Sequence, residues 1–88
     1  MTEAQLREAI LRALATVAPE LDPTRLDPER TFRDQGEIDS IDFLNFVIAV
    51  EAATGLVIPD ADQLRLSSLA GALAYLMPKL ANRERGAA

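Results

Sequence analysis

Apolar residues recur at steps of three and four positions through residues 2–18, and this spacing predicts an amphipathic helix with one buried face. The apolar stripe consists of Leu6, Ala9, Ile10, Ala13, Leu14 and Val17. Thr2 and Gln5 stand three positions apart at its start, which fits a capping box. Pro19 predicts the end of the helix, because the residue before a proline avoids helical backbone angles.

The helical pattern stops over residues 19–38, and this segment is predicted to be a long connection. Pro23 and Pro28 lie there among aspartates and a threonine, which favour turns. An ordered connection of this length is uncommon in a small domain and often has a function. The apolar residues expected to hold it against the core are Leu21, Leu26 and Phe32.

A second helix is predicted over residues 40–54. Asp39 is the expected N-cap, and Asp42 lies close to the positive end of the helix dipole. Gly55 is a suitable residue to end the helix. Apolar residues occur nearly all round this helix, so it is either central to the core or has a second apolar face for a partner. They are Ile41, Phe43, Leu44, Phe46, Val47, Ile48 and Val50.

A short third helix is predicted from about Asp60 to Leu66, with Asp60 or Asp62 as its cap. The preceding Leu56-Val57-Ile58-Pro59 is apolar but short and ends in proline, so we expect an extended link and not a strand.

Ser67 is the expected cap of a last helix, whose stripe consists of Leu69, Leu73, Leu76 and Leu80. Pro78 is expected to fray or end it because proline lacks a backbone donor. Residues 1–81 are therefore predicted to form one domain and residues 82–88 a flexible tail. The predicted fold is all-α: a small four-helix bundle with a long first loop and a short third helix.

The chain has 88 residues, with neither histidine nor cysteine. Serine–histidine pairs, thiol catalysis, disulfides and histidine or thiolate metal sites are therefore excluded. The acidic residues do not have the spacing of an EF-hand calcium loop. A bundle of this size can hardly build the cleft that a carboxylate-pair hydrolase needs. We therefore predict neither a metal site nor enzymatic activity.

Negative charge is concentrated in one part of the chain. The formal net charge is −5, but the window from Asp34 to Asp62 holds seven acids and no base, giving −7 there and +2 elsewhere. Such a field attracts cationic partner surfaces and repels nucleic acid. The start of the chain does not resemble a secretory signal, and the apolar stretch from Phe43 to Ala53 is shorter than the roughly 20 residues of a membrane span. The chain is predicted to be cytoplasmic and monomeric.

The most informative stretch is Asp39-Ser40-Ile41-Asp42. It places a primary hydroxyl at the first turn of a helix, between two acids and after a long loop. The chain has no histidine and a single lysine, Lys79, so Ser40 lacks a base that would make it a nucleophile. A partner that supplies the base could modify it.

The segment from Phe32 to Asp60 resembles the phosphopantetheine-attachment region of acyl carrier proteins, with Asp-Ser-Ile-Asp at its centre and Gly-Leu-Val-Ile-Pro-Asp at its end. The resemblance covers roughly Leu6 to Leu76. It implies that a phosphopantetheinyl transferase moves 4'-phosphopantetheine from coenzyme A onto Ser40. The thiol of that arm would hold acyl groups as thioesters, which explains how a chain without cysteine can carry them.

The resemblance also assigns roles to other residues. Those matching partner-recognition positions are Asp39, Ile41, Asp42, Leu44, Ile48 and Glu51. Those matching positions near an acyl-chain cavity are Phe32, Val47, Val50 and Ile58. The implied partners are acyl-loading, acyl-transfer or condensing enzymes with basic docking patches.

Three positions depart from the family pattern. Ile41 stands where leucine is usual, and Gly36 stands where relatives commonly have a hydrophobic residue, which predicts a looser loop before Ser40. Asn45 replaces a glutamate that is frequent in carriers of general fatty acid synthesis. This favours a specialised lipid or secondary-metabolite pathway. Two alternatives remain: an aminoacyl or peptidyl carrier, and a helical interaction module that is never modified.

Overall fold

The computed structural model describes residues 1–85, and every regular element within them is a helix. The only β-type pairing in this range is an isolated bridge between Thr31 and Ser68. The all-α prediction is therefore confirmed. In chain order the elements are α1 (Glu3–Val17), α2 (Phe32–Gln35), α3 (Ser40–Thr54), the 3-10 helix η1 (Asp60–Leu66) and α4 (Leu69–Arg85).

The first helix forms as its sequence predicts. The Thr2 hydroxyl accepts a hydrogen bond from the Gln5 amide at 3.1 Å, and the Gln5 side chain accepts one from the Thr2 amide at 2.8 Å. This reciprocal capping box satisfies two amides that the helix leaves unpaired. The stripe of α1 then faces the core, with Leu6, Ile10 and Leu14 at most 3% exposed.

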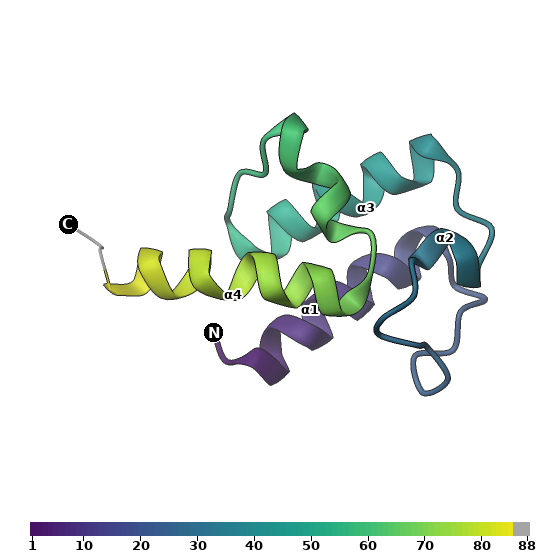
Figure 1. The fold of residues 1–88 in the computed structure, drawn as a ribbon, viewed down its shortest axis with the longest axis horizontal. Coiled ribbons are helices and arrows are strands. Elements are labelled where there is room, and N and C mark those ends of the chain that lie inside the picture. Colours follow the sequence, from purple (N-terminus) through teal and green to yellow (C-terminus); the bar gives the residue numbers. More distant parts are fainter. Residues whose placement is uncertain (86–88) are drawn as a thin grey trace.

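The bundle core lies between α1, α3 and α4, with η1 packed against α4 (Figure 1). Phe32 and Phe46 meet edge to face in this core, with their ring centroids 5.3 Å apart. The long connection and α2 lie at the end of the bundle where α3 begins (Figure 1). The core therefore holds the start of α3 at one end of the molecule.

The long connection contains a short helix, α2, that the sequence pattern did not indicate. Thr31 caps it by accepting a hydrogen bond from the Asp34 amide at 3.2 Å. The Phe32 amide donates to the Ser67 carbonyl at 2.8 Å, which ties α2 to the chain just before α4. Phe32 is 1% exposed, so the prediction that it holds the connection against the core is confirmed.

Gly36 was expected to loosen the loop before Ser40. In the structure, the absence of a side chain at Gly36 instead makes room for Leu21. A side-chain β-carbon at Gly36 would lie only 3.0 Å from side-chain atoms of Leu21. The Gly36 amide also donates to the Phe32 carbonyl at 3.0 Å. Leu21 therefore fills the space that a hydrophobic residue at position 36 would occupy.

The predicted caps around η1 were wrong. η1 follows Pro59 without a side-chain cap. Asp60 accepts from the side chain of Gln63, and Asp62 accepts from the hydroxyl of Tyr75 at 2.7 Å. Both carboxylates therefore accept hydrogen bonds from side chains and not from the backbone amides at the start of η1.

The expected cap of α4 was also wrong by one residue. Ser68 caps the helix by accepting from the Gly71 amide at 3.0 Å. Ser67 instead donates its hydroxyl to the Leu64 carbonyl at the end of η1.

α4 continues past Pro78 to Arg85, so residues 82–85 are helical where a flexible tail was expected. Ala74, whose carbonyl loses its helical donor at Pro78, is exposed, so water can reach that carbonyl. Arg83 donates a 2.6 Å hydrogen bond to the Thr54 carbonyl at the end of α3, which anchors the last turns of α4. The remainder of the expected tail, residues 86–88, lies outside the described residues.

Stability above pH 10 is expected to depend on Tyr75, which joins η1 to α4. Burial, followed by the hydrogen bond and charge of Asp62, raises the pKa of Tyr75 to about 12, while Arg65 opposes the shift. The guanidinium of Arg65 and the ammonium of Lys79 lie 5.0 and 4.9 Å from the ring centroid. Unfolded tyrosine has a pKa of about 10, so the native state retains a proton that the unfolded state loses between pH 10 and 12.

The stabilisation from this shift is therefore complete below pH 10 and is lost as the pH rises towards 12. Tyr75→Phe should remove a decline on the order of 1–2 kcal/mol in the free energy of unfolding over that range. Urea titrations of both proteins at pH 9 and pH 11.5 measure it, since other titrating groups are shared. An equal decline in the variant would contradict the assignment.

Candidate functional site

Ser40 is the first residue of α3 and is exposed. Asp39 precedes it with extended backbone angles and accepts a hydrogen bond from the Asp42 amide at 2.8 Å. The Asp42 carboxylate in turn accepts from the Asp39 amide at 3.3 Å, which completes a capping box. The two acids that flank Ser40 therefore fix the helix start, and the serine side chain between them takes no part in the capping.

Ser40 differs from every other hydroxyl side chain of the protein. The chain has three serines, five threonines and one tyrosine, all among the described residues. Eight of these nine hydroxyl groups make a hydrogen bond within the chain. The hydroxyl of Ser40 makes none to residues 1–85. It is the one hydroxyl of the chain that neither donates nor accepts a hydrogen bond within the described residues.

No general base lies beside this hydroxyl. The chain has no histidine, and Lys79 lies over the Tyr75 ring on α4. The nearest ionisable side chains in sequence are Asp39 and Asp42, whose carboxylates accept backbone hydrogen bonds. Ser40 is therefore an unactivated alcohol, suited to accepting a group from an enzyme that brings its own base.

The outward face of α3 is apolar beyond Ser40. Ile41, Leu44 and Ile48 are 70%, 46% and 52% exposed. Glu51, the other acid of α3 placed among the recognition residues, is half-buried and accepts a hydrogen bond from the Ile58 amide at 2.8 Å. Glu51 therefore holds the link after α3 in place. The face that α3 offers to another molecule consists mainly of aliphatic side chains, and we call Ile41, Leu44 and Ile48 the aliphatic stripe.

The four residues predicted near an acyl-chain cavity come together in the core. Phe32, Val47 and Val50 are each 1% exposed, and Ile58 is 3% exposed. All belong to the single cluster of buried residues. These four side chains are buried in the packed core. An acyl chain would therefore have to push them apart to enter it.

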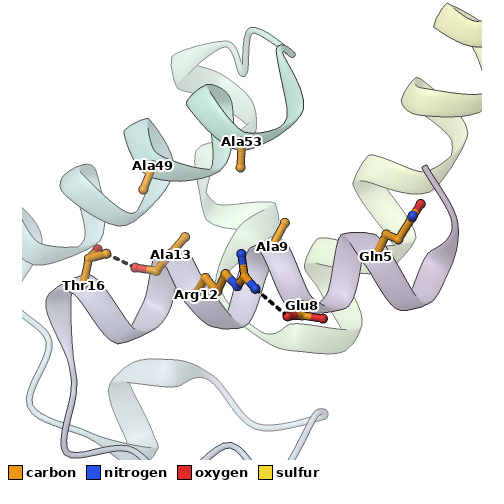
Figure 2. Close-up of a pocket in the computed structure, with 8 residues that line it drawn as sticks. All are labelled: Gln5, Glu8, Ala9, Arg12, Ala13, Thr16, Ala49 and Ala53. Carbon is orange, nitrogen blue, oxygen red and sulfur yellow. Dashed lines mark hydrogen bonds and ion pairs between the residues drawn. The ribbon is translucent and has the colours of Figure 1, made fainter.

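Another groove lies between α1 and α3, with a volume of about 520 Å³. Figure 2 shows alanine side chains of α1 and α3 directed towards each other across it, beside an ion pair between Glu8 and Arg12 of 2.8 Å. Small side chains let the two helices approach closely. The groove does not include Ser40 or its neighbours, and it carries no chemistry of its own.

A second groove, of about 470 Å³, lies at the start of α3, where the flanking acids of Ser40 line it but Ser40 itself does not. Its lining residues are Arg33, Glu37, Ile38, Asp39 and Asp42. Arg33 was not among the predicted site residues. In the sequence, Arg33 is the last basic residue before the window from Asp34 to Asp62, and only this position could have drawn attention to it. The short helix α2 brings its side chain to the groove.

Residues 1–85 contain no group of three or more acidic side chains arranged to hold a metal ion. No helix in the same range has the length and apolar character needed to cross a bilayer.

A family model described as "Phosphopantetheine attachment site" matches residues 5–76, which is most of the chain. The chain belongs to this family. As a carrier it is the substrate of enzymes and is not itself catalytic, and its all-helical fold agrees with this membership. The family match establishes that the domain is one that bears phosphopantetheine.

The carrier is similar to curated relatives along most of their length. It is 33% identical over 73 residues to an acyl carrier protein of Myxococcus xanthus, covering 80% of this chain and 92% of the relative. Identity to an acyl carrier protein of Rubrobacter xylanophilus is 28% over 74 residues, covering 81% and 91%. Identity to the meromycolate extension acyl carrier protein of Mycolicibacterium smegmatis is 30% over 76 residues, covering 83% and 77%. The carrier is therefore of acyl-carrier type.

Proposed function

We propose that Ser40 bears the 4'-phosphopantetheine arm and that the carrier delivers acyl thioesters to the enzymes of a lipid or secondary-metabolite pathway. The observation that supports Ser40 is its hydroxyl, the only one of the chain without a hydrogen bond to the described residues. The names of the relatives, acyl carrier protein and meromycolate extension acyl carrier protein, support an acyl cargo.

Attachment of the arm needs little from the carrier itself. The Ser40 oxygen forms a bond to the phosphorus that bears the pantetheine of coenzyme A. The P–O bond between that phosphorus and the rest of the pyrophosphate breaks, adenosine 3',5'-bisphosphate leaves, and the transferase takes the hydroxyl proton. The chain's contribution is to present that oxygen on a fixed helix start, which the Asp39–Asp42 capping box provides. The arm then supplies a thiol, a group that the 88 residues lack.

Intact-protein mass tests the proposal directly. The full chain is incubated with coenzyme A and a broad-specificity phosphopantetheinyl transferase. We expect the mass of one phosphopantetheine to be added and to map to the peptide that contains Ser40. If a folded chain gains no mass while a control carrier does in the same reaction, the unmodified interaction module becomes the better explanation.

We further propose that the aliphatic stripe docks on partner enzymes, with basic residues of those enzymes placed around Asp39 and Asp42. An aliphatic side chain that becomes buried at an interface typically contributes about 1–2 kcal/mol. Ile48→Ser should therefore lower the transferase kcat/KM about 5- to 30-fold. Because Ile48 is 52% exposed, the fold should be retained.

Val57→Ser is the matched control. Val57 is 83% exposed but lies beyond the far end of α3, roughly 20 Å from Ser40 along a helix of this length. Steady-state rates of the three proteins, with circular dichroism to check folding, provide the measurement. Equal losses in both variants would mean that the stripe has no special part in docking.

A further inference from the structure

The groove beside Ser40 has an unusual distribution of charge. It is bounded by three acidic side chains, those of Glu37, Asp39 and Asp42, and by one basic side chain, that of Arg33. Arg33 comes from α2 and the others come from the link to α3 and its first turn. The guanidinium is thus the only positive group lining the groove next to the proposed attachment point.

Arg33 is also unengaged. Arg12 pairs with Glu8, Arg30 donates to the Asp34 carbonyl, and Arg83 donates to the Thr54 carbonyl. Arg33 is exposed and makes no hydrogen bond or ion pair with any residue in 1–85. Its five N–H donors are therefore available to an anion that enters the groove.

A phosphodiester on Ser40 would be an anion placed between two carboxylates. Its negative charge would be repelled by Asp39 and Asp42, which flank it in the chain. The Asp39 carboxylate already accepts the Asp42 amide, so the helix start has fewer free donors for a phosphate. The compensating charge has to come from outside the helix, and a guanidinium can bind two phosphate oxygens at once.

We propose that Arg33 positions the phosphodiester of the arm, pairing with its oxygens across the groove beside Ser40. This inference rests on the proposed attachment at Ser40. The pairing holds the base of the arm on the α2 side of Ser40. It leaves the aliphatic stripe of α3 uncovered for partner enzymes and partly offsets the repulsion from the two flanking carboxylates.

Phosphorus NMR of the modified full-length carrier tests the pairing. Holo wild type, Arg33→Gln and Arg25→Gln are prepared, and intact mass confirms one arm on each. Arg25 is an exposed arginine of the long connection that lines a different groove, so its variant has the same change in net charge. We expect the phosphodiester resonance to shift in Arg33→Gln and to stay at the wild-type position in Arg25→Gln. Resonances that coincide in all three proteins, or shift equally in both variants, would overturn the proposal.

A second readout needs no change to the protein. The side-chain Nε–H resonance of Arg33 should move when the apo carrier is converted to the holo form, whereas that of Arg25 should not. Arg33→Lys should restore only part of the phosphorus shift, because an ammonium cannot form the two-pronged contact. An unmoved Arg33 resonance in a carrier of confirmed holo mass would refute the pairing and leave the attachment at Ser40 intact. Failure to gain the arm would instead refute the attachment.

Discussion

Replacing Ser40 with alanine is expected to abolish the mass gain from coenzyme A completely while leaving the fold intact. The hydroxyl of Ser40 makes no hydrogen bond to the described residues, and the capping of α3 is carried out by Asp39 and Asp42. The change should therefore alter the free energy of unfolding by no more than about 0.5 kcal/mol. Intact mass after the transferase reaction and a urea titration measure the two parts of this result.

Ser67→Ala is the matched control for that experiment. It removes a hydroxyl that donates to the Leu64 carbonyl, so it should cost about 0.5–1.5 kcal/mol and still gain one arm. Ser40→Ala is thus predicted to lose the mass gain and keep its stability, whereas Ser67→Ala is predicted to lose stability and keep the mass gain. Unfolding of Ser40→Ala would mean that the residue is structural, and a retained mass gain would move the attachment to another side chain.

Replacing Phe32 with alanine is expected to have the largest effect on stability, a loss of about 3–5 kcal/mol. Phe32 is 1% exposed, meets the ring of Phe46 edge to face, and anchors α2 and the long connection to the bundle. Small domains have only about 5–15 kcal/mol of stability in total. The variant should therefore be close to unfolding at 37 °C, with the segment before Ser40 loosened first.

Two further variants calibrate that result in the same urea titrations. Phe32→Leu keeps most of the volume and should lose less than about 1.5 kcal/mol. Val57→Ala removes an 83% exposed side chain and should change stability by no more than about 0.5 kcal/mol. If Phe32→Ala costs no more than Val57→Ala, the ring does not anchor the connection.

The parts of the fold that could be predicted from the sequence are those fixed by neighbours along the chain. The capping box of Thr2 and Gln5 and that of Asp39 and Asp42 each join residues three positions apart. The repeat of apolar residues in α1 is likewise local. Gly55 ends α3 in the left-handed region, with a φ of 73°, as its residue type indicates.

The parts that could not be predicted depend on contacts between distant residues. Asp62 does not cap η1 because Tyr75, 13 positions away, donates to its carboxylate. α4 continues past Pro78, and Arg83 in its last turns donates to a carbonyl 29 positions earlier. α2 begins at Phe32, whose amide donates a hydrogen bond to the distant Ser67 carbonyl. A local sequence pattern cannot indicate partners that lie this far apart in the chain.

The candidate site divides in the same way. Ser40 follows from the short run around it and from the missing histidine and cysteine. The role of Glu51 needed the structure, because its carboxylate accepts from the Ile58 amide seven positions later. Arg33 also needed the structure, because its groove is assembled from α2 and the start of α3. The sequence predicted the attachment residue, and the fold showed which side chains surround it.

The single unengaged hydroxyl also has a practical consequence for labelling this protein. Since none of the 88 residues is cysteine, an arm attached at Ser40 would bring the only thiol in the molecule. A maleimide dye would then mark the arm alone, and a colorimetric thiol assay on the purified protein would count the fraction of chains whose arm has a free thiol. Fluorescence from such a dye would report the movement of the arm against an otherwise unlabelled bundle.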